Sequence, residues 1–249
     1  EEMEDYLRAA GPWVKLVTLA PELEGADKLI AMLRERGITV SAGHTNATYD
    51  QMRSAAGLGI NHVTHHYNGM SPLLSRERGT TGAGLLFDEL TIELIADGYH
   101  VHPDVIAMAF ALKPEGGIAL ITDAMLCAGC PDGYYLSDGV RLVMKNGMVS
   151  LADGDSLAGS SLNMMKALTN TMAFTGLPPE KVLPALTSVP ARQAGVDACK
   201  GSLAAGMDAD FLIVDADWQV RETYVKGRRV FARREEVADG GRSPGGAAG

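Results

Sequence analysis

Short apolar runs alternate with helical patterns over the first half of the chain. Each run is rich in β-branched residues, ends in a polar residue, and is followed by a segment of helical periodicity. One such segment, residues 23–36, has an apolar stripe at helical spacing and stops before Gly37. Continuous apolar strands that alternate with helices are typical of a parallel sheet buried on both faces. The predicted strands cover residues 14–19, 38–42, 62–64, 91–96 and 118–122.

The pattern changes after residue 123. Asp138-Gly139 and Asn146-Gly147 each lie between alternating apolar and polar positions and predict two hairpins within residues 134–150. Helical patterns return over residues 162–174, with Ser160 and Ser161 as expected caps, and over residues 179–186. Two further short strands are predicted at residues 211–214 and 221–225, which turn at Lys226-Gly227.

Composition and charge exclude several classes of partner. The chain has 249 residues, 22 Lys and Arg against 31 Asp and Glu, and a net charge of −9. A nucleic acid or an anionic membrane requires clustered cations, so neither is an expected partner. Three cysteines are too few for a disulfide framework, and no apolar run reaches the roughly 18 residues that span a bilayer. We therefore expect a cytoplasmic protein.

Polar residues that could take part in catalysis or metal binding follow the predicted strands. His44, His65, His100 and Asp123 follow four successive strands. The active site of a parallel α/β barrel lies at the carboxyl ends of its strands. Imidazole and carboxylate groups converging there are typical of a hydrolytic Zn²⁺ or Fe²⁺ site with an open position for water.

Other reactive side chains have simpler interpretations. His62 would lie inside its strand and is interpreted as structural, while His66 should point to the opposite face from its neighbour at position 65. His102 precedes a proline in a turn and is a weak candidate for substrate contact. Cys127 and Cys130 form a C-x-x-C motif without a second pair, so two ordinary thiols are the favoured interpretation.

Three segments could bind a phosphate. Arg76 offers a bidentate guanidinium, and the backbone amides around Asn68 and Gly69 could form an anion nest. The loop at residues 157–161 precedes a predicted helix N-terminus, which also favours anions. Each signal alone is weak.

Five motifs, taken in order and spacing, resemble the N-acetylglucosamine-6-phosphate deacetylase family of the amidohydrolase superfamily. The resemblance runs from about residue 14 to residue 230, and residues 201–211 resemble the strand return of that superfamily's small β-domain. The motifs are Ala-Gly-His-Thr-Asn-Ala at 42–47, Thr-His-His-Tyr-Asn-Gly-Met at 64–70, Asp-Gly-Tyr-His-Val-His at 97–102, Thr-Asp-Ala at 122–124 and Leu-Ala-Gly-Ser-Ser-Leu at 157–162.

This resemblance implies the chemistry of the reacting centre. His44 and His65 would bind a divalent metal, with Zn²⁺ as the first expectation and Fe²⁺, Co²⁺ or Mn²⁺ as alternatives. His100 would bind the substrate and polarise its acetamide carbonyl, and Asp123 would act as general base and then general acid.

The resemblance also implies how a phosphorylated amino sugar is bound. Asn68 and Gly69 would contact the phosphate through their backbone, and Arg76 would reach the phosphate of the neighbouring subunit's substrate in a homodimer. Leu157, Ala158 and Gly159 would line the sugar pocket.

Two family motifs are missing from the sequence. Neither the metal-binding glutamate of a His-Leu-Glu-Gly-Pro motif nor a His-x-His of the first strand occurs. Glu22 matches the family's fourth strand instead, so the resemblance argues against it as the primary ligand. At His66 and Gly69 the family commonly has an apolar residue and alanine.

The implied fold is α/β, an incomplete (β/α)8 TIM barrel of the amidohydrolase type that holds strands four to eight, plus part of a small β-sandwich domain. An open sheet of this kind has uncovered edges. We expect a partial barrel with the metal site at residues 1–130, a hairpin segment at 131–153, barrel-closing helices at 154–200, β-domain strands at 201–232 and a disordered tail at 233–249.

Three functions remain open at this point. The first is the deacetylase, which releases acetate from N-acetylglucosamine-6-phosphate. The second is another amidohydrolase that acts on a cyclic amide, which Arg76 and the nest at Asn68 and Gly69 disfavour because they suit a phosphate. The third is an inactive fragment of the deacetylase with a half-built site.

Overall fold

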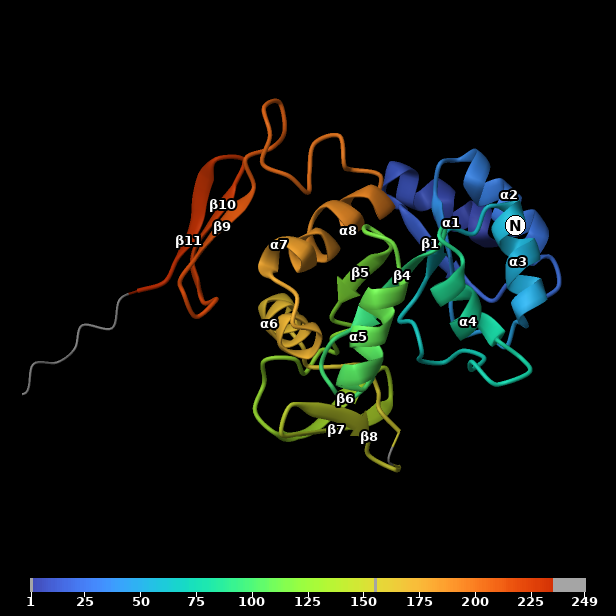
Figure 1. The fold of residues 1–249 in the computed structure, drawn as a ribbon, viewed down its shortest axis with the longest axis horizontal. Coiled ribbons are helices and arrows are strands. Elements are labelled where there is room, and N and C mark those ends of the chain that lie inside the picture. The colour runs from blue at the N-terminus through green and yellow to red at the C-terminus, as the bar shows by residue number, and fades with distance from the viewer. Residues whose placement is uncertain (1, 155, 235–249) are drawn as a thin grey trace, which may run out of the picture. The chain divides into compact units, whose positions relative to one another are not determined.

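A five-stranded parallel sheet organises the first part of the chain in the computed structural model, which describes residues 2–154 and 156–234 (Figure 1). The strand order is the same as the chain order, so every crossover moves one strand along the sheet. All five strands lie where the apolar runs predict them, although each is shorter than its run. They are β1 (Leu16–Leu19), β2 (Thr39–Ala42), β3 (His62–Val63), β4 (Thr91–Ile95) and β5 (Ile118–Ile121).

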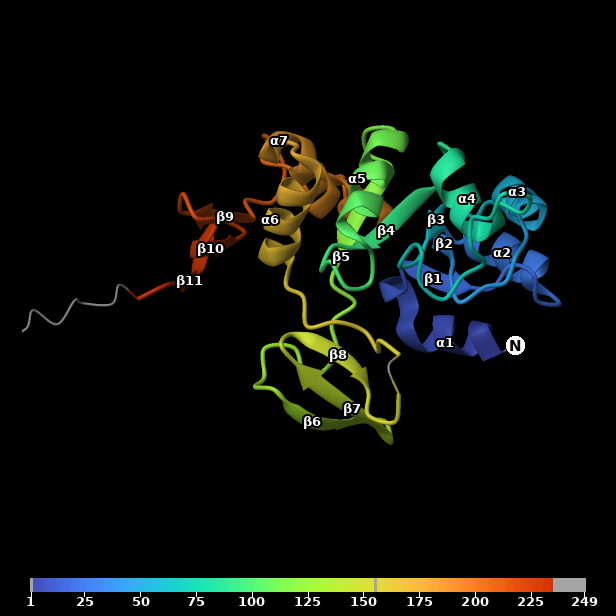
Figure 2. The ribbon, with the colours of Figure 1, turned by 60° about the horizontal axis from the view of Figure 1, so that its bottom comes forward.

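The crossover helices lie together on one side of this sheet (Figure 2). Local signals set where two of them begin. The side chain of Thr48 accepts the N–H of Gln51 in a capping box before α3, and His102 Nδ1 accepts the N–H of Asp104 at 3.2 Å before α5. The helices of this region are α1 (Glu2–Ala10), the 3₁₀ turn η1 (Gly11–Trp13), α2 (Ala26–Glu35), α3 (Tyr49–Leu58), α4 (Gly79–Leu86) and α5 (Pro103–Leu112).

Between the sheet and these helices lies an apolar core with one buried cation. Ile30 of α2, Val40 of β2 and Ile92 of β4 are fully or almost fully buried. Lys113, just after α5, is 6% exposed, and its Nζ donates to the carbonyls of Phe87 at 2.8 Å and Leu90 at 2.7 Å. Burial lowers the pKa of Lys113, while Asp88 and Glu89 act in the opposite direction. Its ammonium group therefore ties the end of α4 to the start of β4.

A small antiparallel sheet follows β5. Its two turns are Asp138-Gly139, with φ of 49° and 82°, and Asn146-Gly147, with φ of 52° and 78°. Two successive positive φ values are the geometry of the hairpin turns that the sequence predicts. The strands are β6 (Gly133–Ser137), β7 (Val140–Lys145) and β8 (Met148–Leu151), and their core contains Cys127, Leu142, Met144 and Val149.

Of the helices that follow, the first is capped differently from the prediction, whereas the second begins at Pro179 as predicted. Asn163, and neither Ser160 nor Ser161, caps the first of them, because the Asn163 side chain accepts the N–H of Lys166 at 2.9 Å. Ser160 Oγ instead donates to the carbonyl of Thr122 and accepts the N–H of Leu162. These helices are α6 (Met164–Thr175), α7 (Pro179–Val182), the 3₁₀ turn η2 (Leu183–Leu186) and α8 (Ser188–Gln193).

Within the described residues, residues 208–234 belong to a second compact unit. It contains an antiparallel sheet in the order β11-β10-β9, in which the rings of Phe211 and Tyr224 stack at 4.4 Å. Most of the tail predicted at residues 233–249 lies outside the described residues, which end at 234. The strands are β9 (Phe211–Val214), β10 (Val220–Val225) and β11 (Arg228–Ala232).

Within the described part of the chain, the cysteines are all free, with Cys127 buried and Cys130 and Cys199 exposed. In that same part, no helix combines the length and the apolar character needed to span a bilayer.

Replacing the buried cation tests the core. Lys113→Met keeps most of the side-chain volume and removes the Nζ donor from two carbonyls. We expect the free energy of unfolding to fall by about 2 kcal/mol in urea denaturation, because buried acceptors lose their partner. The exposed Lys28→Met is the matched control and should change it by less than about 0.5 kcal/mol. Equal effects of the two variants would contradict this role of Lys113.

Candidate metal and active site

Three of the predicted site residues occupy equivalent positions at the carboxyl edge of the sheet. His44, His65 and Asp123 each lie two residues beyond the end of β2, β3 and β5 respectively. All three have left-handed backbones, with φ of 48°, 31° and 50°. Such backbones cost energy in residues other than glycine, and they cluster at functional sites. The chain therefore turns sharply at each of these residues as it leaves its strand.

His44 and His65 meet through their ring nitrogens. Their Nε2 atoms are 2.9 Å apart, and the two rings lie edge to face with centroids 4.6 Å apart. His65 is 8% exposed, whereas His44 is exposed. Gly69 allows the approach of the next loop, since a Cβ there would lie 3.2 Å from His44 Nδ1 and its φ is 57°. The sequence prediction that these two histidines converge therefore has a direct counterpart in the structure.

Glu22 braces the loop that carries His44. Its Oε1 accepts the N–H of Asn46 at 2.6 Å, and its Oε2 accepts the hydroxyl of Thr45. Partial burial alone would raise the pKa of Glu22, but these hydrogen bonds outweigh it and hold the pKa below its ordinary value. Both carboxylate oxygens are thus engaged by the loop, in keeping with the expectation that Glu22 is not the primary metal ligand.

The two histidines supply part of a metal site. Facing imidazole nitrogens are donors that suit Zn²⁺ and related ions. Within residues 2–154 and 156–234, no three His, Cys, Asp or Glu side chains form a group that could hold a metal ion. The structure thus provides two imidazole donors for a metal ion at this edge of the sheet.

Asp97 orients His100. The Nδ1 of His100 lies 2.7 Å from Asp97 Oδ2, and Asp97 Oδ1 accepts the N–H groups of Tyr99 and His100, both at 2.9 Å. Burial would raise the pKa of Asp97, but the hydrogen bonds from His100 and Tyr99 outweigh it and lower the pKa. Because Asp97 engages Nδ1, Nε2 is the atom on the ring's other side that can meet a ligand.

The loop at residues 157–161 is fastened to the end of β5 beside Asp123. The N–H of Ser160 donates to the carbonyl of Asp123 at 2.8 Å, and the N–H of Met125 donates to the carbonyl of Ser160 at 2.8 Å. Gly159 has a φ of 62°, and a Cβ there would lie 2.8 Å from the Asp123 carbonyl and 2.6 Å from Met125 Cγ. The backbone of Gly159 is therefore close to Asp123, and Leu157 and Ala158 precede it in the same loop.

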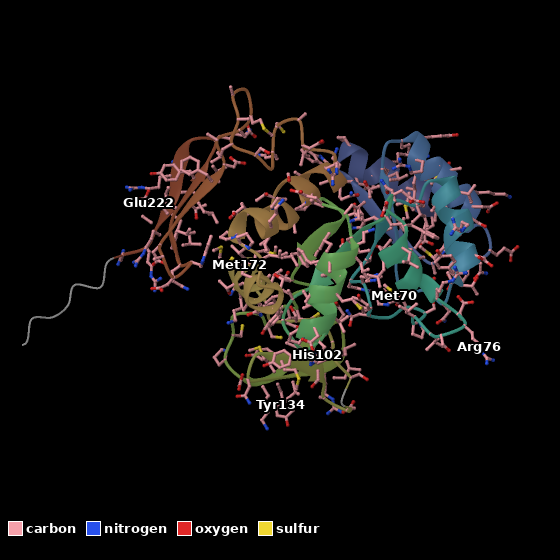
Figure 3. All side chains as sticks on the ribbon, in the orientation of Figure 1. Met70, Arg76, His102, Tyr134, Met172 and Glu222 are labelled. Carbon is pink, nitrogen blue, oxygen red and sulfur yellow. The ribbon has the colours of Figure 1, made fainter. Side chains whose placement is uncertain are left out.

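The structure brings together only some of the residues that are predicted to bind a phosphate. The N–H of Thr45 donates to the carbonyl of Gly69 at 3.1 Å, which places Gly69 beside the His44 loop. The N–H of Asn68 already donates to the carbonyl of His65 at 3.0 Å, whereas within the described residues the Gly69 N–H makes no hydrogen bond. Arg76 is exposed in the loop before α4 and points outward (Figure 3).

The other three histidines of the chain have separate roles. His66 faces Gly84 of α4, where a Cβ would lie 2.4 Å from its Cε1, so it points away from the side of His65 as predicted. Burial, with a smaller contribution from Lys113, lowers the pKa of His66 to about 3. His62 is buried on β3 and pairs with Glu93, as its structural interpretation requires. His102 caps α5.

Two residues near the site were missed by the sequence interpretation. Glu93 lies in the middle of β4 and contacts both His62 and the backbone of His65. The sequence signal that could have identified Glu93 is a single charged residue inside an otherwise apolar strand. Asp97 orients His100, and the sequence signal that could have identified it is its position directly after the predicted strand at residues 91–96.

Fold and site together define a class: part of a parallel α/β barrel with a histidine pair at the carboxyl ends of its strands. The profile of the Amidohydrolase family matches residues 7–230, and the chain belongs to this family. The expected fold class, an incomplete amidohydrolase barrel with part of a small β-domain, is thereby confirmed.

Individual relatives are deacetylases of amino-sugar phosphates. The chain is 38% identical over 231 residues to the N-acetylglucosamine-6-phosphate deacetylase of Vibrio furnissii, covering 93% of this chain and 57% of the relative. It is also 38% identical over 227 residues to the N-acetylgalactosamine-6-phosphate deacetylase of Escherichia coli O157:H7, covering 91% and 60% respectively.

Among solved structures, the N-acetyl-D-glucosamine-6-phosphate deacetylase of Mycobacterium smegmatis matches with a TM-score of 0.87 and 34% identity. This match covers 92% of the present chain and 61% of that protein. The chain thus spans about three fifths of the length of these relatives.

Substitution of Gly159 tests the fastening of the loop to β5. Gly159→Ala adds a Cβ against the backbone of Asp123 in a left-handed conformation, so we expect the free energy of unfolding to fall by about 2 kcal/mol. Urea denaturation measures the change. Gly57→Ala, on α3 with no atom within 4 Å of the added Cβ, is the control and should leave stability unchanged or slightly raised. A Gly159→Ala variant as stable as this control would contradict the tight approach.

The lowered pKa of Asp97 predicts part of the acid sensitivity of the fold. Its folded pKa lies below the unfolded value of about 3.9, so its stabilisation is present above pH of about 4 and is lost as pH falls through the folded pKa. Asp97→Asn should therefore lose less stability than the wild type between pH of about 6 and about 3. Urea denaturation across this range, with the exposed Asp27→Asn as control, measures it. Parallel curves for Asp97→Asn and the wild type would refute the assignment.

Proposed function

We propose that the chain carries the metal-binding and acid–base part of a hydrolase that removes the acetyl group from N-acetylglucosamine-6-phosphate, giving glucosamine-6-phosphate and acetate. The observation that carries the proposal is the contact of His44 and His65 through Nε2 at 2.9 Å, at the same sheet edge as Asp123. Membership of the Amidohydrolase family and 38% identity to a deacetylase of this substrate support it.

His44 and His65 would hold a divalent metal, with Zn²⁺ as the first choice and Fe²⁺, Co²⁺ or Mn²⁺ as alternatives. When bound, such a metal lowers the pKa of a water molecule toward neutrality and polarises a carbonyl. Any further ligand of this metal would have to be one that the described residues do not bring to the two histidines.

Asp123 would move the proton. Its side chain is exposed at the sheet edge, while its backbone is fixed by Ser160, so the carboxylate is free to accept a proton from the attacking water. It would then return this proton to the amine nitrogen, which otherwise leaves poorly. His100, oriented by Asp97, would present Nε2 to the substrate and help to polarise its acetamide carbonyl.

The phosphate would be bound by a few local groups, because the chain has a net charge of −9. The backbone at Asn68 and Gly69 would contact it, with the uncommitted N–H of Gly69 as the main donor. The outward direction of Arg76 supports the expectation that it reaches the phosphate of a neighbouring subunit in a homodimer (Figure 3). Residues 157–159, fastened beside Asp123, would line the sugar pocket. A cytoplasmic location would suit this substrate.

N-acetylgalactosamine-6-phosphate is the second candidate substrate. The deacetylase of that sugar in Escherichia coli O157:H7 matches the chain at the same 38% identity as the relative from Vibrio furnissii. Both candidates require the same amide chemistry and the same phosphate contacts. Acetate release from each sugar, assayed on this polypeptide and on the complete product of its coding region, tests the proposal. Hydrolysis of hydantoin or dihydroorotate in place of both sugars would overturn it.

Removing the carboxylate of Asp123 tests its role. Asp123→Asn should lower kcat by about a hundredfold to ten-thousandfold, the usual contribution of a positioned acid–base group. The metal content should stay near normal, because Asp123 is assigned to proton transfer. Metal analysis and acetate release on the same preparation measure both quantities, with Asp27→Asn as control. Wild-type turnover in Asp123→Asn would remove Asp123 from this role.

A further inference from the structure

Glu93 is a carboxylate in a place where the sheet otherwise buries apolar residues. It lies at the centre of β4 between Ile92 and Leu94, both fully buried, and its own side chain is 15% exposed. Removing a carboxylate from water is costly unless it is paired and hydrogen-bonded. Its presence in the sheet therefore depends on the partners it finds on β3.

Both oxygens of Glu93 bind the strand next to it. Oε1 lies 2.9 Å from the Nε2 of His62, and Oε2 accepts the backbone N–H of His65 at 3.1 Å. The main-chain carbonyl of Glu93 also accepts the N–H of His66 at 2.8 Å. One residue thus holds the backbone of two successive residues, at the point where the chain leaves β3.

His65 requires such a restraint. Its φ of 31° is outside the usual range for a residue with a side chain, and a backbone of this kind persists only where its surroundings enforce it. The direction of its ring follows from this backbone, and the ring places Nε2 2.9 Å from His44 Nε2. The hydrogen bond from the His65 N–H to Glu93 is therefore coupled to the meeting of the two rings.

His62 in turn fixes Glu93. Its ring is 1% exposed, and its Nδ1 has no hydrogen-bond partner among the described residues. An ionised carboxylate can only accept a hydrogen bond, so the Nε2 of His62 is the donor in its contact with Glu93. Because the His62 ring is buried, close packing keeps it in the orientation in which it faces Glu93.

We propose that Glu93, braced by His62, is a positioning residue that holds the backbone of His65 so that its Nε2 converges with that of His44. The inference deepens the proposed function, because it concerns a residue that we assign as a metal ligand. Groups that orient a metal-binding histidine commonly change metal affinity by about tenfold to a hundredfold when they are removed.

The experiment uses three variants of β4 in the same chain. Glu93→Met keeps the side-chain length and removes both acceptors, whereas Glu93→Gln keeps an oxygen that can accept the His65 N–H. Thr91→Val is the matched control, since Thr91 Oγ1 accepts a hydrogen bond from Gln193 Nε2 at 2.8 Å two residues earlier on the same strand. The control thus loses a hydrogen bond on β4 away from His65.

Two readouts are measured on each protein. The first is the NMR signal of the His65 amide together with the cross-peak between the His44 and His65 rings, recorded without metal. The second is the dissociation constant of Zn²⁺ from calorimetric titration. The NMR readout does not depend on catalysis or on a complete metal site. A protein that fails to bind Zn²⁺ therefore counts against the proposed function, while the NMR result still decides the role of Glu93.

We expect Glu93→Met to shift the His65 amide signal upfield, to remove the ring cross-peak and to weaken Zn²⁺ binding at least about tenfold relative to Thr91→Val. Glu93→Gln should retain the cross-peak and most of the affinity. His65 signals in Glu93→Met that match those of Thr91→Val would overturn the proposal, as would a Glu93→Gln variant that behaves like Glu93→Met. If Glu93→Met does not fold, the His62→Phe variant is measured instead. A shifted His65 amide signal in that variant supports the positioning role of Glu93, and an unshifted signal refutes the proposal.

Discussion

The parallel register of five neighbouring strands is the constraint on which the site depends. Because the strands run in the same direction, their carboxyl ends lie along one edge, and residues that follow them become neighbours in space. His44, His65 and Asp123 all occur two residues beyond a strand and all turn through a left-handed backbone. The same local geometry, repeated along the sheet, brings together groups that are far apart in the sequence.

Polar side-chain contacts join neighbouring strands close to this edge. The hydroxyl of Thr64 lies 2.8 Å from that of Thr18 and 2.6 Å from that of Ser41, so three adjacent strands are joined just before the two histidines. Gly43 permits this approach, since a Cβ there would lie 2.7 Å from Thr18 Cγ2. Barrel interiors are usually filled by branched apolar side chains. Here the side chains just before the two histidines include these three hydroxyls and the Glu93–His62 pair, and Glu93 also accepts the backbone N–H of His65.

The sequence predicted the fold and part of the site for a physical reason. Apolar runs mark the strands, and the polar residue after each run marks the edge, so the positions of His44 and His65 could be predicted from pattern alone. The resemblance to known motifs then implied their roles. Glu93 and Asp97 escaped because their importance depends on which atoms they meet across strands and turns. Ser160 was assigned as a helix cap, whereas its contacts with Thr122 and Leu162 show that it joins a loop to β5.

Under the proposed function, His44 and His65 share one metal ion. X-ray absorption spectroscopy of the zinc-loaded protein counts the imidazole ligands of the metal directly, and we expect two. We also expect that His44→Asn and His65→Asn each remove one imidazole, while His102→Asn, at the exposed cap of α5, removes none. A zinc spectrum without imidazole ligands, or one that is unchanged in both His44→Asn and His65→Asn, would contradict a metal ion shared by these two histidines.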